Sequence, residues 1–498
     1  MPKMSRNLAK SKESEEHNYF YKDEILPDIR ARQKAIPTEK DSTVPMEQIP
    51  NHLGMQTIDT KSNIGKYFVE FASTSTIHGL RHWVAPHRHP VEKFLATVFI
   101  VGALLCLISL SVMFWNRYQN EATVIVVNNE RDRFRISKPA AFICPVPNVD
   151  ESKIPDVFIK HGVEHTLEAE RFFTFLANVN YQNMPKTPNF DKVPPNKWLA
   201  ILYDLRRYIP PNNLKEEDRF EAWVVTENGV CLAKRSVFAI YATYEYWTSN
   251  NWTTVPVIPP DQVPYYDHND DHSQEPFVAE NMALFAVCDP FEILSYDIPT
   301  KWTRPQLLQR LIMSISEIKT RANVRELQVH QRKCKFVNDG GLRTWPVYTK
   351  NMCVIECRMR VIEDRCNCRP HFARPIEGVN ICNAAQLRCI GEITKDLFMF
   401  EYPPSFCNCV PNCDVVEYQI TDGEINDLND MPTNSSFINL IVEFPQIIYY
   451  RSLMFGFTDF LTGVGGAAGL FLGASVLSFV EVFYYSTLHI FFYLKRMK

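Results

Sequence analysis

The chain has 498 residues, of which 46% are hydrophobic and 22% are charged, so it is neither a disordered nor a low-complexity sequence. Its formal net charge of −4 argues against a nucleic-acid-binding protein, because such proteins carry strongly basic surfaces. A mean hydropathy of −0.20 excludes a transporter with many spans but leaves room for one or two. By length alone, about three domains are expected.

The first 65 residues are polar, charged and rich in proline, and are expected to form a mobile cytosolic tail. The stretch Phe94–Trp115 that follows has 22 residues without a charge, enough to cross a bilayer core as a helix. It starts too far into the chain for a signal peptide, and the alternative is a buried core helix. Arg81, Arg88 and Lys93 precede it, so the positive-inside rule places the N-terminus in the cytosol.

Short apolar runs in the middle of the chain predict a mixture of strands and helices. Strands are expected at Thr123–Val127 and Val237–Tyr246, whereas Leu311–Ile318 is ambiguous between strand and helix. Helices are expected at Glu168–Leu176 and Asn196–Arg207, the latter after two prolines that suit a helix start. Catalytic and phosphate-binding motifs are absent from the sequence, so neither an enzyme nor a cofactor is predicted.

Ten of the 14 cysteines lie between Cys334 and Cys413, which points to an oxidising compartment and to disulfides. Cys353 and Cys357 would share one face of a helix, about 6 Å apart along its axis. Cys407 and Cys409 would share one face of an extended segment, about 6.6 Å apart. The matching distances favour nested rungs, with further nested pairs on either side. The pairs in this ladder are Cys353–Cys409, Cys357–Cys407, Cys334–Cys413, Cys366–Cys389 and Cys368–Cys382.

Other connectivities of these cysteines remain open, because spacing alone permits many. A zinc site is the other reading of clustered cysteines, but the Cys-x2-Cys spacing usual in such sites is absent here. No metal site is therefore predicted.

A second apolar region, Phe460–Leu494, has 35 residues and a single formal charge, Glu481. This is longer than one straight span requires. Gly465, Gly469 and Gly473 repeat every four residues and would form a smooth helical stripe for close packing. A sharper hypothesis is a helix broken at Gly473-Ala474-Ser475, whose carbonyls line an aqueous ion path. Glu481 would then attract cations.

Lys495, Arg496 and Lys498 follow the second region, so the C-terminus is also expected in the cytosol and the middle of the chain outside the cell. The sequons at Asn251 and Asn434 fit such an outer domain as glycosylation sites.

Several motifs resemble those of the degenerin/epithelial sodium channel family. Ser75-Thr-Ile-His78-Gly79 resembles the family's His-Gly motif, and Lys138-Pro-Ala-Ala-Phe-Ile-Cys144-Pro resembles the start of its outer domain. Gly469-Leu-Phe-Leu-Gly473-Ala474-Ser475 resembles its selectivity filter, and the clustered cysteines resemble its thumb. Phrases such as Gln331-Arg-Lys-Cys-Lys-Phe336 are most similar to the arthropod pickpocket branch.

The resemblance implies an α+β membrane protein with two transmembrane helices and a disulfide-rich β-ball and palm bearing helical thumb, finger and knuckle regions. It implies a trimeric, often amiloride-blocked, sodium-selective channel of the plasma membrane, assembled from like or related subunits. His78 and Gly79 would line the inner pore with Gly465, Gly469 and Glu481, and Gly473, Ala474 and Ser475 would form the filter. It adds the pair Cys144–Cys231 and leaves Cys106 and Cys288 free.

The expected organisation runs in five parts. Residues 1–93 are the cytosolic N-terminal region with the re-entrant motif, 94–115 the first span and 116–446 the outer domain. Residues 447–494 form the second span with the filter, and 495–498 the cytosolic end.

The chain departs from acid-sensing relatives, which carry a second carboxylate where Tyr484 stands, so proton gating of their kind is in doubt. His268 and His272 could bind a metal or sense protons, although a solvated acidic loop is the simpler reading. The gating stimulus and any extracellular ligand are not readable from the sequence. A two-span receptor or adhesion protein without a pore is the alternative, and a mere anchor would not need the broken, glycine-rich second region.

Overall fold

The fold places two stacked β-sheets beside a helical membrane region. The computed structural model describes residues 63–77, 79–86, 88–129, 135–209, 221–249, 263–266, 274–399, 407–427, 435–445 and 447–496. Residues Tyr67–Lys498 form one unit, and the contacts reported below lie within it.

The larger sheet has six strands in the order β1-β13-β10-β12-β7, with β11 pairing to β10. Its long strand β10 runs antiparallel to β11 and parallel to β12 and β13. The run Leu311–Ile318, which was ambiguous in the sequence, lies in β10 and is therefore a strand. The strands are β1 (Thr123–Asn128), β7 (Gln274–Glu280), β10 (Leu307–Thr320), β11 (Val415–Asp427), β12 (Ser435–Glu443) and β13 (Ile448–Leu453).

The smaller sheet is antiparallel, in the order β4-β5-β3-β8-β9, and a separate ribbon pairs β2 with β6. Both faces of its central strand β3 are buried: Phe142 packs among helices, and Ile143 packs toward the larger sheet. The strands are β2 (Ile136–Ser137), β3 (Ala140–Pro145), β4 (Glu221–Thr226), β5 (Gly229–Lys234), β6 (Tyr265–Tyr266), β8 (Ala283–Cys288) and β9 (Lys301–Thr303).

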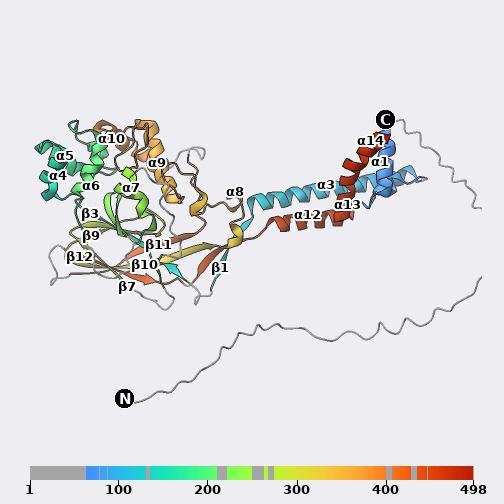
Figure 1. Cartoon of the computed structure of the whole chain (residues 1–498). Helices are drawn as coiled ribbons and strands as arrows, with labels where there is room; N and C mark the ends of the chain where they lie inside the picture. Colours follow the sequence, from blue (N-terminus) through green and yellow to red (C-terminus); the bar gives the residue numbers. More distant parts are fainter. Residues whose placement is uncertain are drawn as a thin grey trace, which may run out of the picture. The chain divides into compact units, whose positions relative to one another are not determined.

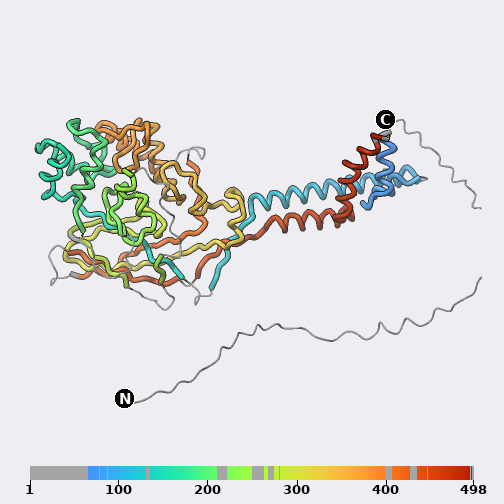
Figure 2. Tube along the Cα trace, in the orientation of Figure 1, coloured from blue at the N-terminus to red at the C-terminus, as the bar shows by residue number. Residues whose placement is uncertain are grey.

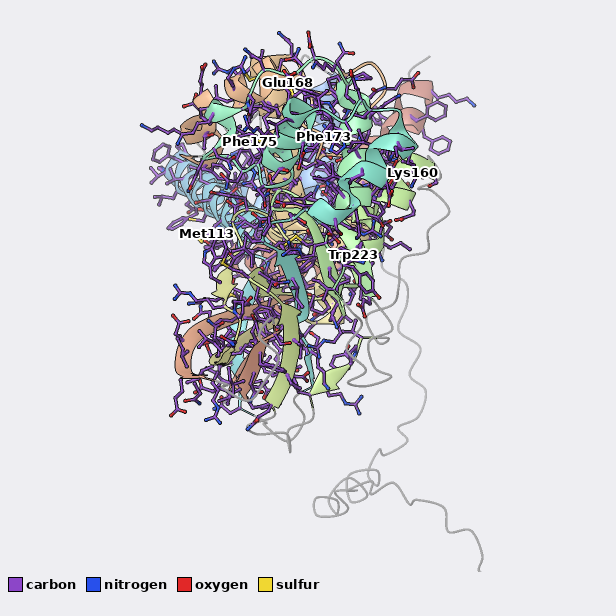
Figure 3. All side chains as sticks on the ribbon, turned by 90° about the vertical axis from the view of Figure 1, so that its left-hand side faces the viewer. Met113, Lys160, Glu168, Phe173, Phe175 and Trp223 are labelled. Atoms are coloured by element: carbon purple, nitrogen blue, oxygen red, sulfur yellow. A yellow bond between two sulfur atoms is a disulfide. The ribbon has the colours of Figure 1, made fainter. Side chains whose placement is uncertain are left out.

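Helices cover the face of the smaller sheet that points away from the larger one (Figure 1). Figure 3 views this helical cover end-on, with Lys160 of α4, and Phe173 and Phe175 of α5, labelled. The α-helices are α4 (Ile154–His161), α5 (Leu167–Ala177), α6 (Trp198–Leu205), α7 (Tyr244–Ser249), α8 (Val329–Arg332), α9 (Lys350–Cys366), α10 (Ala384–Glu392) and α11 (Thr394–Met399). Short 3-10 turns are η2 (Glu151–Lys153), η3 (Met184–Lys186), η4 (Pro195–Lys197), η5 (Val237–Ala242), η8 (Ala322–Val324) and η9 (Val337–Asp339).

Most of the predicted outer-domain elements are confirmed, and one is wrong. The predicted helices appear as α5 and as η4 followed by α6, and the predicted strand at 123–127 appears as β1. The run Val237–Tyr246, predicted as a strand, instead forms η5 and the start of α7. Most of its side chains are buried, so its apolar residues do not alternate with polar ones. A run without this alternation can be a buried helical turn as well as a strand.

The membrane region has two apolar helices long enough to span a bilayer, Pro90–Asn120 and Val476–Tyr493, and a shorter apolar helix, Phe457–Leu472. Figure 2 shows α3 and α12 running side by side. The helices are α1 (Asn63–Thr74), α2 (Leu80–Val84), α3 (Pro90–Asn120), α12 (Phe457–Leu472), α13 (Val476–Tyr484), the π-helical turn η10 (Tyr485–His489) and α14 (Ile490–Arg496).

Both predicted spans differ from the observed elements at their ends. α3 extends the predicted span of 94–115 in both directions, because Pro90 suits the first helical turn and the His89 side chain accepts a hydrogen bond from the Val91 N–H. The predicted second span begins at 447, yet β13 occupies the first part of that range and the helix starts only at Phe457. Pairing of β13 with β1 and β10 keeps this part in the sheet.

Candidate functional site

A short non-helical segment divides the apolar region near the C-terminus. α12 ends at Leu472 and α13 begins at Val476, so the break falls at the three predicted residues. Gly473 has a φ of 58°, a left-handed conformation that glycine adopts without steric cost and that commonly ends helices. Ser475 is extended and caps α13 through its side-chain oxygen, which accepts from the Ser478 N–H at 3.4 Å.

The break leaves backbone carbonyls of α12 without helical partners. In a continuous helix, the N–H groups of Ala474 and Ser475 would bond to the carbonyls four residues earlier. Here the Ala474 N–H donates instead to the Ala468 carbonyl at 3.3 Å, and the Ser475 N–H donates to Ser478 Oγ at 3.1 Å. Carbonyls released in this way inside an apolar region require water, an ion or other protein groups as partners.

The glycine stripe does not make the contact between α3 and α12. A Cβ at Gly463 would lie 3.2 Å from the Phe114 ring of α3, so Gly463 provides the close approach. At Gly465 a Cβ would meet no described atom within 4 Å. The stripe member Gly465 is therefore open to a neighbour outside this chain, whereas Gly463, the glycine that packs against α3, does not belong to the stripe.

The segment before the first span turns at Gly79 and packs against α3. Gly79 has a φ of 94°, and a Cβ there would lie 3.0 Å from a side-chain carbon of Ile100 in α3. The positive φ favours glycine at this position, and a larger residue would also have to displace the Ile100 side chain. His78 lies outside the described residues, so its predicted place beside the ion path remains a prediction.

Glu481 is engaged by the segment that precedes His78. Its Oε2 accepts a hydrogen bond from the Thr76 N–H at 3.2 Å and another from Thr76 Oγ1 at 2.9 Å. Thr76 Oγ1 also lies 2.7 Å from Ser478 Oγ, and Ser478 is only 2% exposed. The predicted lone carboxylate thus has partners, and the sequence analysis missed both Thr76 and Ser478. The hydroxyl residues directly before the His-Gly motif were the available signal.

Aromatic rings fasten α1 to the end of the second span, where the blue and red segments meet in Figure 2. The Tyr67 hydroxyl donates to the Tyr485 carbonyl, and the rings of Tyr67 and His489 have their centroids 5.4 Å apart. Tyr485 is the first and His489 the last residue of the π-helical turn η10. Such turns are frequent at functional sites, because they displace side chains from the regular helical face.

The disulfide ladder in the outer domain joins the same cysteines that the sequence analysis paired. Cys353 and Cys357 lie on α9, and Cys407 and Cys409 lie on a segment outside the helices and strands that is bridged to it. Cys288 is a buried free thiol and Cys106 an exposed one. The bridges are Cys144–Cys231, Cys334–Cys413, Cys353–Cys409, Cys357–Cys407, Cys366–Cys389 and Cys368–Cys382.

A buried arginine fastens α9 to the rest of the outer domain. Arg358 is 1% exposed and donates to both oxygens of Glu227, at 2.9 and 2.7 Å, and to Asp297 at 2.6 Å. Glu227 lies in the turn between β4 and β5 and also accepts from the Tyr181 hydroxyl at 2.7 Å. The sequence offered no periodicity or spacing that marks this cluster.

Several carboxyl groups gather where β8, β10 and β11 meet. Asp289 accepts from the Phe291 and Val416 N–H groups, at 2.9 and 3.3 Å. Burial raises the pKa of Asp289 to about 6. Burial, followed by the neighbouring carboxylates, raises the pKa of Glu292 to about 8. Burial also raises the pKa of Glu317 to about 7, although Lys319 opposes this shift.

The raised pKa values of these three carboxyl groups predict that the groups make the outer domain less stable above neutrality. The folded state holds these protons to a higher pH than the unfolded state, in which such carboxyls release them near pH 4. Stability is therefore lost as the pH rises from about 4 to about 8. The thermal midpoint of the purified protein should be lower at about pH 8.5 than at about pH 6. Glu292→Gln should raise the midpoint at the higher pH and flatten the dependence.

The exposed Glu424 supplies the control, and Glu424→Gln should leave this pH dependence unchanged. A midpoint that stays constant or rises between the two pH values would contradict the prediction.

Within the described parts of the chain, no group of three or more histidine, cysteine or carboxylate side chains is placed to hold a metal ion. The predicted glycosylation sites and the histidine loop lie outside the described residues, namely Asn251, Asn434, His268 and His272. The structure brings together the helix break, the segment between α1 and α2, and the carboxylate of Glu481, which accepts hydrogen bonds from that segment. Freed carbonyls and a carboxylate in an apolar region suit the passage of an ion.

Comparison with known proteins agrees with this assignment. Pickpocket protein 19 of Drosophila melanogaster is 22% identical over 469 residues, covering 82% of this chain and 88% of that protein. Pickpocket protein 28 of the same species is 25% identical over 185 residues, covering 33% of this chain and 30% of that protein. Sodium channel protein Nach of Drosophila virilis is 25% identical over 176 residues, covering 33% of this chain and 46% of that protein. This chain thus matches less than half of the last two.

The family model described as amiloride-sensitive sodium channel matches residues 71–274 and 297–485, which include α3, most strands of both sheets, α12 and α13. This family comprises ion channels and not enzymes. The match covers most of the sequence and confirms the resemblance drawn from the motifs, and the chain therefore belongs to the amiloride-sensitive sodium channel family, also known as the degenerin/epithelial sodium channel family.

Proposed function

We propose that the chain is a subunit of a trimeric, sodium-selective and amiloride-sensitive channel of the plasma membrane, gated through its outer domain. The observation that carries this proposal is the helix break at Gly473, Ala474 and Ser475, which frees carbonyls inside an apolar region. Carbonyl rings replace part of an ion's hydration shell in selective pores. The name of the Nach relative, a sodium channel protein, supports sodium as the ion.

In this proposal Gly473, Ala474 and Ser475 form the selectivity filter. Gly465 and Gly469 face the axis above it, where Gly465 has no described neighbour on its open side. His78 and Gly79 line the path below the filter, and Glu481 adds negative charge there. Related subunits from other genes could complete the trimer, and an extracellular ligand could bind the outer domain.

The proposed organisation places both termini in the cytosol, with 1–93 and 495–498 inside, 94–115 and 457–494 in or against the membrane, and 116–456 outside. Basic residues beside both apolar regions support this orientation. Glycan mapping should then find sugar at Asn251 or Asn434. An epitope placed after Lys498 should stain only permeabilised cells, and staining of intact cells would overturn the orientation.

Replacing Ser475 by cysteine tests the filter assignment. The substitution exchanges a small hydroxyl for a larger sulfur in every subunit while the surrounding backbone stays the same. We expect the sodium-to-potassium permeability ratio, measured from reversal potentials, to change by about threefold or more, the effect of one altered polar contact. Amiloride block should change with it.

A Thr462→Cys variant is the matched control, because Thr462 lies on α12 with its hydroxyl bonded to the Thr458 carbonyl. It should leave the permeability ratio unchanged. If Ser475→Cys reached the surface normally and kept the wild-type ratio and block, Ser475 would only pack between helices. Wild-type chain that reached the surface without any current, both alone and together with related subunits, would favour the alternative, a two-span receptor or adhesion subunit.

A further inference from the structure

The hydrogen bonds below the helix break form a chain with a fixed direction. The single hydroxyl proton of Thr76 is donated to Glu481 Oε2, 2.9 Å away. Thr76 Oγ1 must then accept the proton of Ser478 Oγ, at 2.7 Å. Ser478 Oγ in turn accepts from the Ser475 N–H at 3.1 Å. Because Thr76 donates to Glu481, Ser478 must donate to Thr76, and the direction of each bond is thus fixed by the next one.

The first member of this chain controls the direction of a carbonyl. The peptide unit between Ala474 and Ser475 is planar and trans, so its C=O points opposite to its N–H. Because the Ser475 N–H is held toward Ser478, the Ala474 carbonyl points back toward the end of α12. The geometry around Gly469 agrees, since a Cβ at that glycine would lie 3.8 Å from the Ala474 oxygen.

We propose that Ser478 is a positioning residue for ion selectivity, which fixes the direction of the Ala474 carbonyl and is itself held by Thr76 and Glu481. The inference rests on the proposed function, because it assigns the segment 473–475 to the filter. It adds that the re-entrant segment contributes to selectivity through Thr76 without lining the filter. The burial of Ser478 supports this role, since a hydroxyl that is 2% exposed has no bulk water as a substitute partner.

The role of Glu481 changes accordingly. Its carboxylate ends the hydrogen-bond chain, so it orders the filter in addition to any attraction it exerts on cations. Glu481→Gln separates these two effects, because the amide oxygen can still accept from Thr76 while the charge is gone. We expect Glu481→Gln to lower conductance and to keep the sodium-to-potassium ratio.

The decisive comparison is between two substitutions of Thr76. Thr76→Val keeps the shape and removes the hydroxyl, whereas Thr76→Ser keeps the hydroxyl and removes a methyl group. Thr76→Val and Ser478→Ala should each change the permeability ratio by about fivefold, the effect of one lost hydrogen bond at the filter. Thr76→Ser and the control Thr462→Val should retain the wild-type ratio at normal surface expression.

A wild-type ratio in Thr76→Val and Ser478→Ala channels would overturn the proposal, because a merely structural hydroxyl would change expression only. A second measurement keeps the test independent of current. The thermal midpoint of the purified full-length chain in detergent should fall less in the double variant than the sum of the two single losses. Additive losses would show that the two hydroxyls are not coupled. Coupled hydroxyls in a chain that gives no current, both alone and with related subunits, would support the hydrogen-bond chain and reject the proposed conduction.

Discussion

Arg358→Ala is expected to abolish most of the folded protein at the cell surface. Arg358 is almost fully buried and neutralises Glu227, whose own side chain is 3% exposed. Burial opposes the charge on Arg358, but Glu227 outweighs this effect, so the pKa of the guanidinium is raised. Alanine would leave Glu227 buried without its cation. Breaking a buried pair in this way costs about 3–5 kcal/mol, a large part of the stability of a typical domain.

The position of Arg358 enlarges the effect, because the pair joins segments that are far apart in the sequence. Arg358 lies 131 residues from Glu227 and 61 residues from Asp297. Loss of the pair would therefore release α9, and with it the disulfide ladder, from the smaller sheet. Burial raises the pKa of Tyr181 well above its usual range, so its hydroxyl stays protonated and donates to Glu227 without replacing the lost positive charge.

Thermal unfolding of the purified protein and surface labelling in cells measure the effect. Arg365→Ala is the matched control, because Arg365 lies on the same helix with a side chain that is 57% exposed. The double variant Arg358→Met with Glu227→Gln should recover part of the loss, since it removes the uncompensated charge. If Arg358→Ala lowered the midpoint no more than Arg365→Ala does, the pair would have no stabilising role.

The disulfide ladder and the helix break were predictable because each depends on local geometry. Two cysteines four apart on a helix and two cysteines two apart on an extended segment have similar rises, so spacing favoured the rungs of α9 among the connectivities that it left open. Gly473 and Ser475 carry the usual chemistry of a helix end and a helix start. In the helix break three consecutive residues carry the signal, and in the ladder two short cysteine pairs carry it, although they lie 50 and 56 residues apart.

The contact of Thr76 with Glu481 could not be predicted in the same way, because it joins residues 405 positions apart. The sequence around neither residue indicates that it contacts the other. The run 237–246 failed for a related reason, since its surroundings and not its own period decide between helix and strand. Arg358 and Glu227 share this property, as a buried ion pair depends on packing that brings distant segments together.

Gly473→Ala is expected to reduce the current per surface channel by about tenfold, provided that the break is the conducting element. Gly473 has φ 58°, and the left-handed region costs a residue with a Cβ about 1–2 kcal/mol. Alanine is also the best helix former, so the substitution favours continuing α12 across the break. A continuous helix would return the freed carbonyls to helical hydrogen bonds and remove them from the ion path. About 1.4 kcal/mol corresponds to a tenfold shift between the broken and continuous forms.

Gly473→Asn distinguishes the backbone effect from simple obstruction, because asparagine is larger than alanine but tolerates the left-handed conformation. If the backbone break carries the current, the asparagine channel should conduct better than the alanine channel. If a side chain at this position merely blocked the path, the order would be reversed. Single-channel recording with counted surface subunits measures both, and a current lower in Gly473→Asn than in Gly473→Ala would reject the break as the reason for conduction. The comparison therefore tests whether ions pass because α12 stops at Leu472, the feature that most clearly separates a pore from an anchor.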